Sequence, residues 1–110
     1  MIASVSGVVQ RVEEQALVVA VSGGVGLRLH VPAGLAQSAR PGEEISLHTH
    51  LVVRTDALTL YGFETPTERG LFAVLLGVNG VGPRLALAIL STLSPEAIRR
   101  AVFGEQAEIF

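Results

Sequence analysis

The feature that most constrains the fold is a change in hydrophobic periodicity at Thr65. Before it, apolar residues alternate with polar or small ones, most clearly over residues 25–31, as in a half-buried strand. After it, apolar residues such as those at 71–76 recur at helical spacing. A chain of 110 residues has room for one domain or two very small ones. We therefore predict a β domain at 1–64 and a helical domain at 65–110.

Turn signals divide the first domain into short strands. Ser22-Gly23-Gly24 and Pro41-Gly42 mark tight turns, and residues 35–40 leave room for a short helix or turn. Five short strands with such a gap are typical of an OB-fold barrel. The predicted fold class is therefore a five-stranded OB-fold β-barrel followed by a small α-helical domain. We expect its strands at 1–12, 16–21, 25–31, 45–53 and 58–63.

Three helix starts follow. Thr65-Pro66-Thr67-Glu68 has the pattern of a capping box with proline at the first helical position. A second helix begins at Pro83, and Ser94-Pro95-Glu96 begins a third, which we expect to end at Gly104. Residues 105–110 resemble the start of another helix. We expect the apolar face of the second helix to comprise Leu85, Ala86, Ile89, Leu90 and Leu93.

The most informative segment joins the first two of these helices, at residues 75–86. Two glycines flank a valine, and a new helix begins at once. The unpaired amides and the dipole at a helix start favour an anion, and successive outward amides form an anion nest. The segment therefore predicts a helix-hairpin-helix phosphate clamp, although a capping glycine followed by a turn is the simpler alternative. The predicted phosphate-binding residues are Asn79, Gly80, Val81, Gly82, Arg84 and Leu85.

Bulk charge leans slightly against nucleic-acid binding. The formal net charge is −2, whereas DNA-binding domains are usually basic. All eight basic residues are arginine, which suits bidentate phosphate contact. Backbone amides also bind phosphate without much positive charge and without reading bases, so binding should be independent of base sequence. No secretory signal or membrane-length apolar run is visible, and we expect a cytoplasmic protein with no membrane contact.

Other candidate sites are weaker. The glycines at 23–26 lack the Gly-Lys-Ser/Thr of a phosphate loop, so a hairpin turn is favoured. His48 and His50 share a strand face but have no third ligand at metal-binding spacing. Glu13-Glu14 and Glu43-Glu44 are interpreted as turn charges. With no cysteine and no Ser-His-Asp context, we expect no catalytic residue, no metal and no cofactor.

Short motifs along nearly the whole chain resemble those of the RuvA family, the Holliday-junction recognition subunits of bacterial branch migration. The hairpin sequence Asn-Gly-Val-Gly-Pro carries most of this resemblance. The matching segments are 1–2, 23–26, 30–32, 49–50, 52–54, 56–57, 60–63, 68–69, 71–72, 79–83 and 85–91.

The resemblance implies a non-catalytic, structure-specific DNA-binding subunit for recombination and repair. It implies two helix-hairpin-helix motifs and a homotetramer that opens a four-way junction. RuvB ATPase and RuvC resolvase are the implied partners, with RuvB held by a C-terminal domain. Arg54-Thr55-Asp56 matches the family's acidic pin at the junction centre, where negative charge repels phosphates.

Two departures from the family matter. The pin often carries two adjacent acids, whereas Thr55 stands beside Asp56 here, so we expect weaker repulsion. The chain also ends before the family's second hairpin and C-terminal domain, so we expect lower junction affinity and no coupling to the motor.

Two other hypotheses remain open. One is a DNA glycosylase or nuclease fragment, although lysine-dependent lyase chemistry is excluded without lysine and no acid cluster stands out for metal-assisted hydrolysis. The other is a protein-assembly module whose truncated form binds DNA weakly or not at all.

Overall fold

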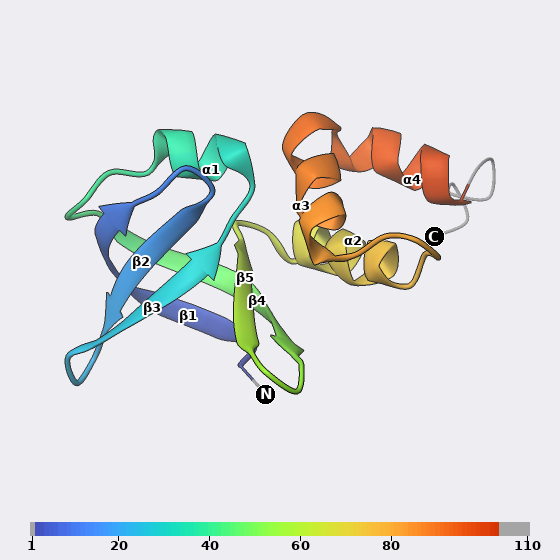
Figure 1. The fold of residues 1–110 in the computed structure, drawn as a ribbon. Helices are drawn as coiled ribbons and strands as arrows, with labels where there is room; N and C mark the ends of the chain where they lie inside the picture. Colours follow the sequence, from blue (N-terminus) through green and yellow to red (C-terminus); the bar gives the residue numbers. More distant parts are fainter. Residues whose placement is uncertain (1, 104–110) are drawn as a thin grey trace.

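The computed structural model describes residues 2–103. Within them, a five-stranded barrel is followed by three helices, and a short helix lies between the third and fourth strands (Figure 1). The strands are β1 (Ser4–Val12), β2 (Ala16–Val21), β3 (Val25–His30), β4 (Glu44–Val53) and β5 (Leu58–Phe63). The helices are α1 (Ala33–Ser38), α2 (Pro66–Leu76), α3 (Pro83–Thr92) and α4 (Pro95–Phe103).

The barrel closes in the order β1-β2-β3-β5-β4. All of its strand pairs are antiparallel except β3 with β5, which run parallel and place His30 opposite Tyr61. Alternate residues of the strands point inward and form one buried cluster, as period-two patterning requires. The predicted five-stranded barrel followed by helices is confirmed, and the glycines at 23–24 lie in the turn between β2 and β3.

Helices α2 and α4 each have a side chain that caps their first turn. The Thr65 hydroxyl accepts a hydrogen bond from the Glu68 amide at 3.2 Å and also donates one to the Glu68 carboxylate at 3.2 Å. Glu68 therefore reaches the threonine hydroxyl, whereas a standard capping box uses the threonine amide. Ser94 caps α4 in the same way, accepting from the Ala97 amide at 3.1 Å. These local bonds place each helix start where the sequence predicted it.

The helices pack against one side of the barrel through a second buried cluster. Phe72 of α2 is fully buried, with ring centroids 4.8 Å from Tyr61 and 5.0 Å from Phe63, both on β5. Polar contact adds to this packing, because the Ala33 amide of α1 donates to the Ser91 hydroxyl of α3 at 3.0 Å. Strand β5 therefore belongs to both clusters and fixes where the helices stand.

One part of the predicted core was wrong. Leu85 and Leu93, expected on the apolar face of α3, are 49% and 45% exposed, whereas Leu87 is buried. Helix α3 is apolar on nearly every side, so periodicity does not identify its core face; contact with β5 and α2 does. The expected helix end at Gly104 and the expected helix at 105–110 lie outside the described residues.

Candidate nucleic-acid interface

A tight turn joins α2 to α3. The Val81 amide donates to the Val78 carbonyl at 3.1 Å, which closes a four-residue turn. Gly80 occupies the third position of that turn with φ of +84°, the left-handed conformation that glycine adopts without steric cost. The Val81 amide is used inside the turn and is not available to a ligand. The predicted clamp therefore has one donor fewer than expected, although the tight turn between the two helices is present.

The start of α3 leaves amides free. The first hydrogen bond of the helix runs from the Ala86 amide to the Gly82 carbonyl, at 2.9 Å. The amides of Arg84 and Leu85 precede that ladder, and no side chain caps them. Both residues are exposed. Pro83, which has no amide, occupies the first turn without losing a hydrogen bond.

The backbone conformation requires glycine at position 80 but not at position 82. The φ of −93° and ψ of 178° at Gly82 are open to any residue, and a Cβ built on it would meet no atom within 4 Å. The protein's own packing therefore does not require glycine at 82. A ligand that comes close to the backbone would require it, because a side chain there would stand in the way.

A cleft of about 750 Å³ lies between the barrel and the start of α3. His30 and Tyr61, whose ring centroids are 5.6 Å apart, line it from β3 and β5. Arg84 lines it from α3, and Arg54 lines it from the end of β4. Gly82 and Arg84 of the hairpin and Arg54, 28 or more residues earlier in the sequence, therefore share one concave surface.

The pKa values of His30 and Tyr61 reflect these surroundings. Burial lowers the pKa of His30, and the positive charges of Arg28 and Arg84 lower it further, against an opposing effect of Glu13. Burial raises the pKa of Tyr61, while the charges of Arg54 and Arg84 oppose that rise. Both guanidinium groups are therefore close enough to act on the Tyr61 hydroxyl.

The loop at 54–57 forms the tip of the β4–β5 hairpin. The Arg54 amide donates to the Ala57 carbonyl at 2.9 Å, and Thr55 and Asp56 are exposed. Arg54 lines the cleft, and the other two predicted pin residues do not. Asp56 is therefore exposed at the tip of the hairpin, whereas Arg54 lines the cleft.

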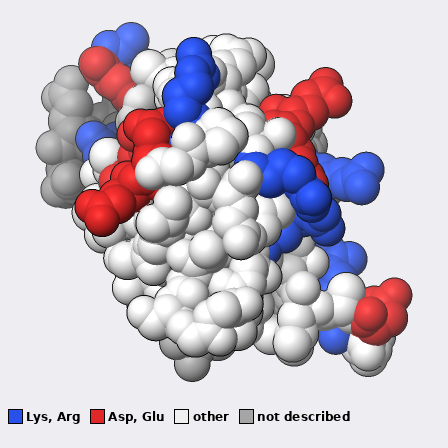
Figure 2. Space-filling view, turned by 90° about the vertical axis from the view of Figure 1, so that its left-hand side faces the viewer, with Lys and Arg blue, Asp and Glu red and all other residues white. Residues whose placement is uncertain are grey.

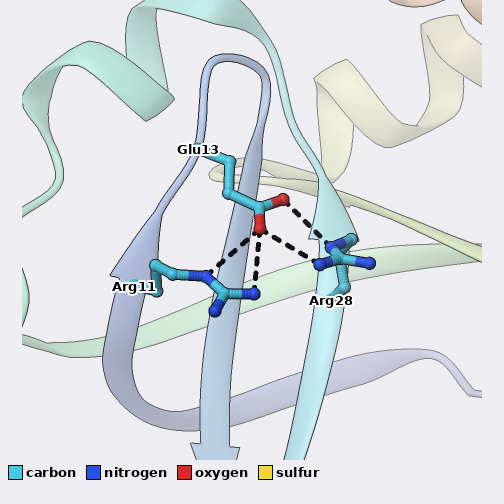
Figure 3. Close-up of polar contacts among 3 residues, drawn as sticks. All are labelled: Arg11, Glu13 and Arg28. Carbon is cyan, nitrogen blue, oxygen red and sulfur yellow. Dashed lines mark hydrogen bonds and ion pairs between the residues drawn. The ribbon is translucent and has the colours of Figure 1, made fainter.

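Glu13 has a larger role than that of a solvated turn charge. Its carboxylate bridges Arg11 of β1 and Arg28 of β3, with contacts of 3.0 to 3.2 Å (Figure 3). These two guanidinium groups, led by Arg28, lower the pKa of Glu13. The interaction neutralises much of the positive charge that Arg28 brings to the barrel surface.

His50, one of the two histidine candidates on β4, packs against α2. The His50 ring packs edge-on against Phe72, with centroids 5.4 Å apart. No group of three or more metal-ligating side chains occurs within residues 2–103.

On the barrel side opposite the helices, acidic and basic side chains are mixed around a broad uncharged area (Figure 2). None of the helices within the described part of the chain has the length and apolar character needed to cross a membrane.

Comparison with known families agrees with this geometry. Residues 1–62 match the RuvA N-terminal domain, and residues 72–109 match the SAM-like helix-hairpin-helix tandem. The chain belongs to the RuvA family. The hairpin and its exposed amides lie inside the second match, and the resemblance predicted from short motifs is confirmed.

Curated relatives carry the name Holliday junction branch migration complex subunit RuvA. The relative from Thermobifida fusca is 51% identical over 107 residues, which is 96% of this chain and 52% of that protein. The relative from Micrococcus luteus is 50% identical over 105 residues, covering 96% and 49%, and that from Herpetosiphon aurantiacus is 48% identical over 106, covering 96% and 53%. The chain spans about half the length of these RuvA relatives.

Proposed function

We propose that this chain binds four-way junction DNA as a non-catalytic subunit of branch migration. The observation that carries the proposal is the pair of uncapped amides at Arg84 and Leu85, beside a glycine that the fold itself does not require. Amides in this arrangement bind a phosphate oxygen at the positive end of a helix dipole. Because they contact backbone and not bases, the interaction is independent of base sequence.

Replacing Gly82 with alanine tests the clamp. The added methyl enters empty space, so the fold should persist, but it stands where a phosphate would approach. We expect about tenfold weaker binding to a synthetic four-way junction, the loss of roughly one charge-assisted hydrogen bond. The measurement is a gel-shift titration at low salt. Gly70→Ala is the matched control, because its Cβ also meets open space, on an exposed turn of α2.

Structure specificity needs a separate comparison. Wild-type chain should bind the junction more tightly than a linear duplex of the same base composition, with affinity falling steeply as salt rises. Equal affinity for the two DNAs would indicate a general DNA-binding module and would contradict the junction proposal. An unaltered affinity in Gly82→Ala would remove the hairpin as the contact. Cleavage or base release from either DNA would support the enzyme hypothesis.

Protein assembly is a second candidate function. Val53 and Leu58, next to the exposed loop, are 62% and 72% exposed, and exposed apolar residues at such positions mark contact surfaces. We propose that they contribute to homotetramer formation. Sedimentation equilibrium measures the oligomer directly, and Val53→Ser with Leu58→Ser should shift it toward monomer. Tetramers without DNA affinity at low salt would favour assembly as the main function.

The remaining assignments extend the same proposal. We infer that residues 1–64 and 65–110 are separate domains, and that Arg54, Thr55 and Asp56 meet the junction centre. We also infer that RuvB supplies ATP hydrolysis as a separate protein, that RuvC acts on the same junctions, and that the complex works in the cytoplasm. These inferences rest on membership of the RuvA family, whose relatives are named as subunits of a Holliday junction branch migration complex.

A further inference from the structure

We propose that the cleft between the barrel and α3 binds a second DNA backbone phosphate, held by Arg54 from the barrel side and Arg84 from the helix side. The inference rests on the proposed function, because the first phosphate is the one at the start of α3. It assigns Arg54 to backbone binding and leaves Asp56 as the charged residue at the loop tip.

The charges in the cleft favour an anion. Its lining residues include two arginines and no acidic side chain. Glu13 engages Arg28, the neighbouring arginine on β3, but within residues 2–103 neither Arg54 nor Arg84 forms an ion pair. Two guanidinium groups that share a concave surface without a counter-charge bind phosphate oxygens well, because each offers a planar fork of donors.

The surface around the arginines adds donors and restricts water. Thr59 and Tyr61, which carry hydroxyl groups, belong to the lining, and so does His30, whose ring centroid lies 5.6 Å from that of Tyr61. Tyr61 is mostly buried and stacks on Phe72 behind it. Charge-assisted hydrogen bonds are stronger on such a partly dry surface than in open water.

The cleft also lies on the path of the bound strand. Gly82 belongs both to its lining and to the hairpin, so a backbone that touches the start of α3 reaches the cleft directly. At about 750 Å³, the space is within the range of sites that hold small ligands. A strand that places one phosphate on the α3 amides therefore brings a neighbouring phosphate between the two arginines.

Removing one guanidinium tests the assignment. We would titrate a synthetic four-way junction and a matched linear duplex with wild type, Arg54→Gln and Arg84→Gln at several salt concentrations. Each phosphate contact contributes about 0.9 to the slope of log affinity against log salt. We therefore expect each variant to bind both DNAs about tenfold more weakly, with the slope shallower by about one.

Arg40→Gln is the control, because Arg40 is an exposed arginine that bonds the end of α1 and lies outside the cleft. If Arg54→Gln bound DNA with the same affinity and salt dependence as Arg40→Gln, the inference would be overturned. A loss of DNA affinity in Gly82→Ala would still support the hairpin as a contact. Loss on junctions only, with an unchanged slope, would show that Arg54 does not bind a backbone phosphate and would also overturn the inference. Absence of DNA binding by wild type would instead remove the proposed function.

Discussion

At the residue scale, His30 shows how one side chain combines burial with neighbouring charge. It packs beside Tyr61, with Arg28, Arg84 and Glu13 near enough to act on its charge. The net effect lowers its pKa below the ordinary value of 6.5. The folded protein therefore binds a proton at His30 less readily than the unfolded chain does.

This depressed pKa has a consequence for stability. Between the lowered pKa and pH 6.5, the unfolded chain binds more protons at His30, so the free energy of unfolding should fall as pH drops through that window. Above pH 6.5 this contribution should be constant. Urea denaturation at pH 7.5 and pH 5.5 measures the difference. His30→Gln should reduce it, and an equal pH dependence in the variant would contradict the assignment.

Thr55 is the residue that distinguishes this loop from an acidic pair. It is exposed beside Asp56, so Thr55→Glu adds a charge without burying it. The second carboxylate should repel duplex phosphates more strongly, and we expect about threefold weaker duplex binding at low salt. Gel-shift titration of duplex and junction gives the ratio. Thr55→Gln controls for side-chain size, and an equal loss in it would show that charge is not the cause.

At the scale of the element, α2 depends on its cap. Thr65 accepts from the Glu68 amide at 3.2 Å, satisfying one of the free donors at the helix start. Thr65→Ala should lower the free energy of unfolding by about 1 kcal/mol. Chemical denaturation followed by circular dichroism measures this, with the exposed Thr67→Ala as the control. Because alanine has a higher helix propensity than threonine, Thr67→Ala should carry no cost, and a similar cost in both variants would show that loss of the cap is not the cause.

Helix α3 illustrates what periodicity does not determine. Seven of its ten residues are apolar, so more than one face satisfies helical spacing. The structure buries Ala86, Leu87 and Leu90 and exposes Leu85. Packing in one buried cluster with α2 and β5 selects that face, and no pattern within α3 itself encodes these partners. The Leu85 amide is free for a different reason: it lies in the first turn of α3, before the helical hydrogen bonds begin.

At the scale of the whole molecule, Phe72 joins the helices to the barrel. Its ring contacts Tyr61, Phe63 and His50 and is fully buried. Phe72→Ala should cost about 3–5 kcal/mol, because the cavity would lie at the centre of this packing. We expect wild type to unfold in one cooperative thermal transition and the variant to unfold in two.

Differential scanning calorimetry measures both the shift and the number of transitions. Val74→Ala, at a more exposed position of α2, should unfold almost as wild type does. Two transitions in wild type would mean that the barrel and helices are energetically independent. In that case the cleft between them would not be a fixed surface.

By itself, the sequence determined the strands, the helix starts and the hairpin at 79–85. These follow from period-two patterning, capping residues and turn glycines, which act over a few neighbouring positions. Only the tertiary structure decided which face of α3 is buried, that Glu13 engages Arg28, and that Arg54 shares a cleft with Arg84. The ion pair depends on the β2–β3 register, and the shared cleft depends on the parallel β3–β5 pair that closes the barrel; no local pattern specifies such contacts between elements.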